Sequence, residues 1–249
     1  MNPKPRYEEL DYRQTQLGEL ILRRRTILAL EGREVLEMIL NGEHLMSSLF
    51  TAVEIALARL GLAAAEEVFP DQPLDVVVGG LGLGYTAQAA LEHRSVGTLR
   101  VVDFLEPVIE WHRQERVPLG AELNADPRCE FVHGDFFKLA LAKPGEPSFN
   151  ASDSEQKFHA VLLDIDHTPS HHLNESNAPL YTPEGLCRLA DKIHPGGVFA
   201  MWSDDPPTDA FMNLLREVFA SAESHIVTFD NPLRGDTSAS TVYVAKRPA

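Results

Sequence analysis

From Leu74 onward, short apolar segments alternate with segments of helical periodicity, and this alternation constrains the fold more than any other feature. We expect strands at 74–78, 99–103, 129–133, 159–164 and 197–202. We expect helices at 84–93, 107–116, 182–193 and 208–219. Strands that are apolar throughout are buried on both faces, as in a parallel sheet covered by helices. The sequence therefore predicts an α/β fold with a mostly parallel sheet.

The two ends of the chain depart from this alternation. Strands expected near 225–229 and 241–245 are joined by a short loop without a helix, which predicts a C-terminal antiparallel hairpin. Near the other end, Asn41-Gly42 separates two apolar runs and predicts a tight hairpin turn. We therefore expect a small N-terminal β-hairpin unit at 1–46 and a larger domain at 47–249. A helix at 49–60 should open that domain, with Ser47 or Ser48 as its cap and Gly61 as its end.

Composition narrows the classes of partner and location. The formal net charge of −15 disfavours nucleic acid as a partner and would attract a cationic substrate, although solubility alone also explains it. No apolar run approaches the roughly 18 residues of a membrane span. The polar first residues predict no signal peptide. Cys129 and Cys187 have no metal-site spacing, so we expect a cytoplasmic protein.

Glycines gather where the first strand of the larger domain ends. Gly80, Gly82 and Gly84 follow the apolar strand and precede a helix. Such a turn lets a ligand approach the backbone closely, and the helix N-terminus offers free N–H groups. A tight turn without a ligand is the alternative interpretation. With a suitable acid further along the chain, these glycines become candidate cofactor-binding residues.

Two acids at the ends of later strands support a nucleoside ligand. Asp103 ends the second strand about 20 residues after the glycines, where an acid can accept hydrogen bonds from ribose hydroxyls. Asp135 follows the third strand and could accept from an adenine amino group. The alternatives are a helix N-terminal acid for Asp103 and a helix cap for Asp135. The final hairpin without a helix favours an S-adenosyl ligand over a nicotinamide one.

Asp164 is the candidate catalytic residue. It ends the fourth strand, and ligands of open α/β sheets bind at this edge. A carboxylate there could take a proton from an amine nucleophile; the alternative is a structural acid behind the site. His167, His171 and His172 follow, but Pro169 interrupts any helix that would align them, so no metal site is predicted.

Several segments, taken in order, resemble the spermidine synthases, within the class I S-adenosylmethionine-dependent methyltransferase-like folds. The matching segments are Val102-Asp103-Phe104-Leu105-Glu106-Pro107-Val108-Ile109-Glu110, Asp126-Pro127-Arg128, Gly134-Asp135, Leu180-Tyr181-Thr182-Pro183-Glu184 and His194-Pro195-Gly196-Gly197-Val198. The resemblance implies a seven-stranded Rossmann-like domain, an N-terminal β domain and a homodimer. It also implies aminopropyl transfer from decarboxylated S-adenosylmethionine to an amine, with Asp164 as the base.

The sequence departs from that family at three places. Residues 42–48 replace the family's polyamine-pocket segment and lack its tyrosine and its His-Glu pair. Leu83 is interpreted as standing where the family's glycine loop carries an acid, and His167 stands where the family has a second acid. Two other functions therefore remain open. One is an S-adenosylmethionine-dependent methyltransferase acting on a small molecule, and the other is a non-catalytic nucleoside-binding or interaction protein.

Overall fold

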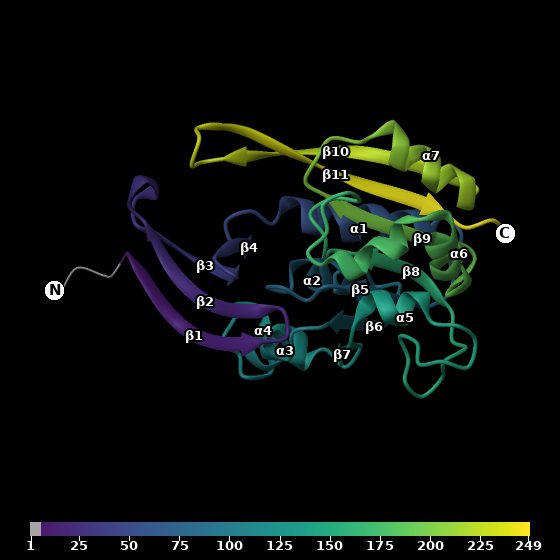
Figure 1. The fold of residues 1–249 in the computed structure, drawn as a ribbon, viewed down its shortest axis with the longest axis horizontal. Coiled ribbons are helices and arrows are strands. Elements are labelled where there is room, and N and C mark those ends of the chain that lie inside the picture. Colours follow the sequence, from purple (N-terminus) through teal and green to yellow (C-terminus); the bar gives the residue numbers. More distant parts are fainter. Residues whose placement is uncertain (1–5) are drawn as a thin grey trace.

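The computed structural model describes residues 6–249, and its strands form two sheets (Figure 1). The N-terminal sheet is antiparallel, in the order β1 (Tyr7–Thr15), β2 (Gly18–Ile27), β3 (Arg33–Leu40) and β4 (Glu43–Ser47). A short 3₁₀ turn, Leu28–Leu30, lies between β2 and β3. Residues 1–5 of the unit predicted at 1–46 lie outside the described residues, and the domain division after residue 46 stays a prediction.

The predicted Asn41-Gly42 hairpin turn is confirmed. Leu40 and Glu43 are paired across it, so the connection has two residues. Asn41 and Gly42 have φ of 53° and 81°, the left-handed values that this kind of turn demands at both positions. The turn directs β4 back along β3 and thereby brings residues 44–47 beside the larger domain.

The larger sheet has the order β10-β11-β9-β8-β5-β6-β7 within residues 6–249. Its parallel strands are β5 (Leu74–Gly79), β6 (Val96–Asp103), β7 (Cys129–His133), β8 (Phe158–Leu163) and β9 (Ile193–Ser203). The antiparallel strands are β10 (Ser221–Asn231) and β11 (Asp236–Lys246). The predicted α/β class, the seven-stranded mostly parallel sheet and the C-terminal hairpin are confirmed.

Helices cover both faces of this sheet. One face packs against α1 (Ala52–Glu66), α2 (Tyr85–Leu91), α3 (Glu106–Arg113) and α4 (Gly120–Ala125). The other packs against α5 (Phe136–Leu141), α6 (Pro183–Asp191) and α7 (Asp209–Val218), with a 3₁₀ helix at Glu175–Tyr181. Alternate residues of one strand serve the two cores: Val76 and Val78 face the first, and Val77 faces the second. None of the helices in residues 6–249 combines the length and apolar character of a membrane span.

The first helix differs from its prediction at both ends. It begins after Thr51, because Ser47 and Ser48 accept hydrogen bonds from the backbone of Leu49 and Leu36 instead of capping it. It also continues past Gly61 to Glu66. Gly61 is a packing position, since a Cβ there would lie 2.5 Å from Cδ2 of Leu162 on β8. The missing side chain lets α1 lie close to the sheet.

Candidate functional site

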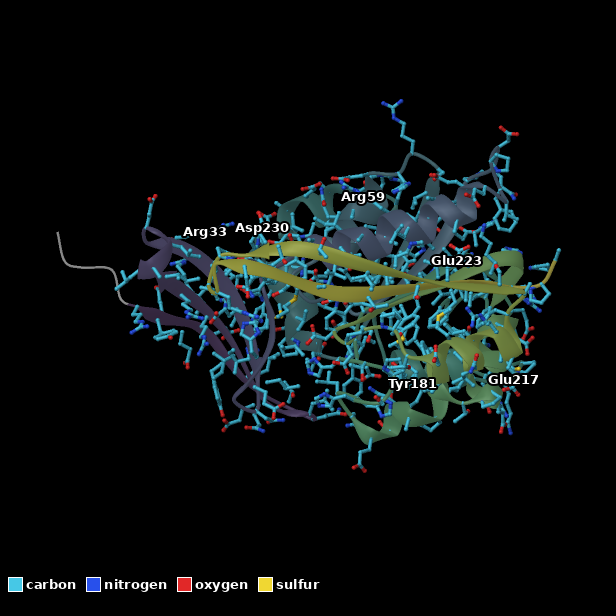
Figure 2. All side chains as sticks on the ribbon, turned by 90° about the horizontal axis from the view of Figure 1, so that it is seen from above. Arg33, Arg59, Tyr181, Glu217, Glu223 and Asp230 are labelled. Carbon is cyan, nitrogen blue, oxygen red and sulfur yellow. The ribbon has the colours of Figure 1, made fainter. Side chains whose placement is uncertain are left out.

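A large cavity lies at the carboxyl ends of the parallel strands. Its volume is about 890 Å³, within the range of sites for small molecules and cofactors. Residues of β3 and β4 line one side, and residues of the β10–β11 hairpin line another. Figures 1 and 2 show why: the tip of that hairpin reaches toward the N-terminal sheet. The cavity is therefore built by both sheets together.

The glycine loop follows β5 and is only partly exposed to the cavity. Gly80 and Gly82 line the cavity and have φ of 96° and 48°. A Cβ on Gly80 would collide with the backbone carbonyl of Asp164, so this position requires glycine. Gly84, with φ of 95°, is the N-cap residue just before α2 and does not line the cavity; a Cβ there would meet Leu123 and His112. The structure thus places two of the three candidate glycines at the cavity.

Leu83 does not lie at the ligand site, where the resemblance to the spermidine synthases suggested it. Its side chain is fully buried in the core and does not line the cavity, so the interpretation that it occupies an acid's place at the ligand is wrong. Leu81 and the two glycines Gly80 and Gly82 are the loop residues that line the cavity. The Leu83 N–H points toward Sδ of Met46 at 2.9 Å, which ties the loop to β4.

Asp103 and Asp135 both line the cavity, and both also make structural hydrogen bonds. Asp103 accepts from the Leu81 N–H at 2.9 Å and from the Leu105 N–H at 2.8 Å, so it holds the glycine loop next to the start of α3. Burial raises the pKa of Asp103, and these backbone bonds oppose the increase. Asp135 caps α5 by accepting from the Lys138 N–H at 3.2 Å. The capping role considered for Asp135 is therefore present, and the same residue lines the cavity.

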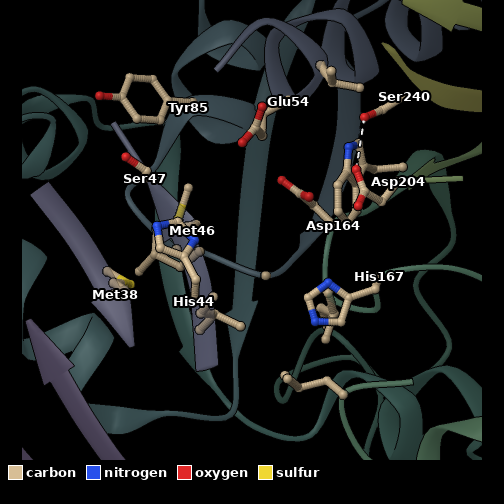
Figure 3. A pocket seen from close by; sticks show the side chains of 18 of the residues that line it. Met38, His44, Met46, Ser47, Glu54, Tyr85, Asp164, His167, Asp204 and Ser240 are labelled. Carbon is tan, nitrogen blue, oxygen red and sulfur yellow. Dashed lines mark hydrogen bonds between the residues drawn. The ribbon is translucent and has the colours of Figure 1, made fainter. Parts of the chain in front are cut away.

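Asp164 follows β8, and its carboxylate lies within the cavity (Figure 3). The Thr86 hydroxyl on α2 donates to its Oδ2 at 2.6 Å and so orients it. Burial raises the pKa of Asp164 to about 6, and the Thr86 bond opposes that increase. A carboxyl with this pKa can be either protonated or ionised near neutral pH, which suits proton transfer.

Glu54 is a site residue that the sequence did not reveal. It lies in the first turn of α1, and its carboxyl reaches the cavity on the side facing Asp164 (Figure 3). Burial and the nearby charge of Asp164 raise the pKa of Glu54 to about 8. The apolar spacing from Leu49 to Leu60 predicted a helix here, but nothing in that spacing says which part of the chain Glu54 meets.

The three histidines after β8 do not converge. His167 lines the cavity, and its ring centre lies 5.0 Å from that of the exposed His171. His172 stacks on Tyr181, with ring centres 4.9 Å apart. Across residues 6–249, no group of three or more histidine, cysteine and acidic side chains is arranged to hold a metal ion.

Known proteins resemble this chain in sequence and in fold. No family model matches the sequence. Polyamine aminopropyltransferase 2 of Pseudomonas aeruginosa is 29% identical over 168 residues, which are 64% of this chain and 43% of the relative. Polyamine aminopropyltransferase of Pyrobaculum islandicum is 29% identical over 126 residues, which are 51% of this chain and 40% of that relative. The matches therefore span less than half of each curated relative.

Solved structures share the fold over nearly the whole chain. A spermidine synthase in complex with the transition state analogue AdoDATO superimposes with a TM-score of 0.70 at 18% identity, covering 96% of this chain and 73% of that one. Spermidine synthase from Thermotoga maritima gives 0.69 at 19% identity, covering 96% and 72%. The chain thus resembles polyamine aminopropyltransferases in part of its sequence and spermidine synthases in its fold, the similarity that its motifs indicated.

Proposed function

We propose that this chain is a transferase that moves an aminopropyl group from decarboxylated S-adenosylmethionine to an amine. The observation that carries the proposal is the partly buried Asp164 carboxyl, oriented by Thr86 inside a cavity that Gly80, Gly82 and Asp103 also line. The likeness to polyamine aminopropyltransferases supports the same reaction. The homodimer and the cytoplasmic location implied by the sequence stay predictions.

The residues of the cavity fit an adenosyl compound with a cationic tail. Gly80 and Gly82 allow close approach of the ligand to the loop, Asp103 would accept from the ribose hydroxyls, and Asp135 would accept from the adenine amino group. The lining cations Lys138 and Arg234 are each already paired with an acid. The carboxylate of S-adenosylmethionine itself would therefore lack a partner, which favours the decarboxylated form.

The chemistry divides between the bound compound and this chain. The sulfonium compound supplies an electrophilic carbon and a thioether leaving group. Asp164 accepts one proton from the substrate ammonium, and the freed amine forms the new C–N bond while the C–S electron pair returns to sulfur. Asp164 must be ionised to act, so we expect the rate to rise with pH through the region of its pKa, about 6.

A binding panel and a turnover assay test the proposal together. We expect decarboxylated S-adenosylmethionine and methylthioadenosine to raise the melting temperature, with about 2.7 kcal/mol added at a hundred times the dissociation constant. With an amine present, the wild type should release methylthioadenosine, measured by mass spectrometry. Asp164→Asn should bind methylthioadenosine as before but lose about two or more orders of magnitude in turnover.

Asp71→Asn is the matched control, because Asp71 is exposed and lies away from the cavity. Stabilisation by NAD alone would overturn the adenosyl assignment. If the assay detected methyl transfer from S-adenosylmethionine, the chain would be a methyltransferase and not an aminopropyltransferase. Binding without any turnover would indicate a non-catalytic protein. Undiminished turnover by Asp164→Asn would remove Asp164 from the role of base.

A further inference from the structure

Glu54 and Asp164 form a pair of carboxyl groups inside the cavity without a cationic partner from the described chain. The two side chains come from α1 and from the end of β8, and Figure 3 shows them pointing into the same space. Within residues 6–249, neither forms a salt bridge with a lysine, arginine or histidine. The Thr86 hydroxyl donates to Asp164 and lies 3.4 Å from the Glu54 backbone carbonyl, so it lies between the two elements that carry the pair.

The other charged groups of the cavity do not neutralise this pair. Its remaining titratable lining residues are His44, Tyr85, Asp103, Asp135, Lys138, His167, Asp204 and Arg234. Lys138 is paired with Asp135 at 3.3 Å, and Arg234 is paired with Asp236 at 2.9 Å. Two partly buried carboxylates without a counter-ion are costly. Burial raises the pKa of Asp164 to about 6, and burial together with the nearby charge of Asp164 raises the pKa of Glu54 to about 8.

We propose that Glu54 and Asp164 together receive the ammonium group of the amine substrate, so that Glu54 is a substrate-binding residue of the transfer reaction. This inference rests on the proposed function and names the part of the acceptor that the site recognises. The cavity wall also carries a group of large apolar side chains: Met38, Leu45, Met46, Phe50, Trp202 and Phe229. A primary ammonium on an aliphatic stem matches both features, because the carboxyls take the charge and the apolar wall takes the stem.

Binding of such a cation changes the protonation of the pair. The raised pKa values of Glu54 and Asp164 predict that the free pair keeps one proton near neutral pH, mainly on Glu54, and has one negative charge. An incoming ammonium stabilises the second carboxylate, so Glu54 releases its proton to solvent as the ammonium binds. The charges balance: one cation enters, one proton leaves, and both carboxylates then face the ammonium. Asp164 can take a proton from that ammonium in the transfer step.

Calorimetry with butylamine as the probe tests this directly. At pH 7, titration in phosphate and in HEPES separates the heat of binding from the heat of buffer protonation. We expect the wild type to release about one proton per butylamine bound. Glu54→Gln should release none and should bind butylamine about tenfold more weakly at pH 8, equivalent to roughly 1.4 kcal/mol. Butanol, the uncharged analogue, should not compete with butylamine.

Glu67→Gln is the matched control, because Glu67 lies at the other end of the same helix, is exposed, and pairs with Lys246 outside the cavity. Wild-type binding of butylamine without proton release would overturn the inference, even if Glu54→Gln did not fold. Equal affinity of Glu54→Gln and wild type would overturn it as well. Methylthioadenosine binding without butylamine binding would reject the pair but keep the adenosyl site. Butylamine binding with proton release, without methylthioadenosine binding, would keep the pair but reject the proposed function.

Discussion

His112 supports the glycine loop from behind the cavity. It is fully buried on α3, and its Nε2 lies 2.9 Å from the carbonyl oxygen of Gly82. A carbonyl only accepts, so Nε2 carries a proton and donates in this contact. Burial lowers the pKa of His112 to about 4, against an opposing effect of the Gly82 bond. A neutral, donating imidazole is therefore part of the folded loop.

This arrangement predicts a loss of stability in acid. The folded pKa of His112 lies below its ordinary value of 6.5, so the stabilisation is complete above pH 6.5 and is lost as the pH falls toward 4. The full difference is on the order of 3 kcal/mol. His112→Gln keeps an N–H donor for Gly82 but cannot titrate, so its unfolding free energy should fall less than that of the wild type between pH 7 and pH 4.5. Urea denaturation at both values measures this.

Comparing the wild type with His112→Gln separates the effect of His112 on the unfolding free energy from the effect of the acids in the cavity. Glu54 and Asp164 have raised pKa values, so their contribution has the opposite sign and is lost as the pH rises toward 8. That contribution is common to both proteins and cancels in the difference. His112→Leu, which leaves the Gly82 carbonyl unpaired, should cost about 1–3 kcal/mol at pH 7. Identical acid profiles of wild type and His112→Gln would contradict the assignment.

Site residues at strand ends could be predicted from sequence, whereas those on helices could not. Asp103 and Asp164 each follow an apolar run, and the ends of parallel strands share one edge of the sheet. Glu54, Thr86 and His112 lie on helices, where the apolar pattern identifies the buried face but not its neighbours. Their roles depend on how α1, α2 and α3 pack around the loop, which is a tertiary property.

Among the elements, the segment after β8 is organised by Asp166. This residue is fully buried and accepts from the Leu173 N–H at 2.7 Å, the Asn177 side-chain amide at 2.8 Å and the Tyr181 hydroxyl at 2.7 Å. Leu173 and Asn177 also line the cavity. One carboxylate thus holds a wall of the cavity in place, in a segment whose histidines had raised the question of a metal.

Asp166→Asn should loosen this wall. The amide has a single acceptor oxygen, so at least one of the three donors loses its partner, at a cost of about 1–3 kcal/mol. We expect faster proteolysis between residues 168 and 181 and weaker butylamine binding, measured by mass spectrometry and calorimetry. Tyr181→Phe is the comparison variant, because it removes the hydroxyl that donates to Oδ2 of Asp166 and keeps both donors to Oδ1, from Leu173 and Asn177. Unchanged proteolysis and affinity in Asp166→Asn would show that the segment is held by other contacts.

At the scale of elements, the sequence predicted the positions of the strands in the larger sheet better than the lengths of the helices. β7, Cys129–His133, has the predicted bounds. The prediction for α1 ended at Gly61, since glycine is a common helix terminator. Here glycine serves close packing against Leu162, and a sequence pattern does not distinguish these two uses.

For the whole molecule, docking of the N-terminal sheet completes the cavity. Asp11 of β1 accepts from Nε1–H of the fully buried Trp111 on α3 at 2.7 Å. Arg13 on the same strand and Arg116 after α3 pair with the same carboxylate, at 2.9 Å and 3.4 Å. The apolar pattern of the sequence did not predict the Asp11–Trp111 hydrogen bond, because the two residues are 100 positions apart. The link places β3 and β4 where Met38 and Met46 can line the cavity.

Asp11→Ala should therefore affect binding although Asp11 does not line the cavity. Removing the carboxylate leaves the Trp111 N–H buried and unpaired, and we expect the unfolding free energy to fall by about 1–3 kcal/mol. Butylamine affinity should fall too, because the β3–β4 side of the cavity is held less firmly. Urea denaturation and calorimetry measure the two effects. Glu8→Ala is the control on the same strand, since the Glu8–Arg24 pair is exposed and worth little. Lower stability with unchanged affinity would mean that the larger domain binds the amine without the N-terminal sheet.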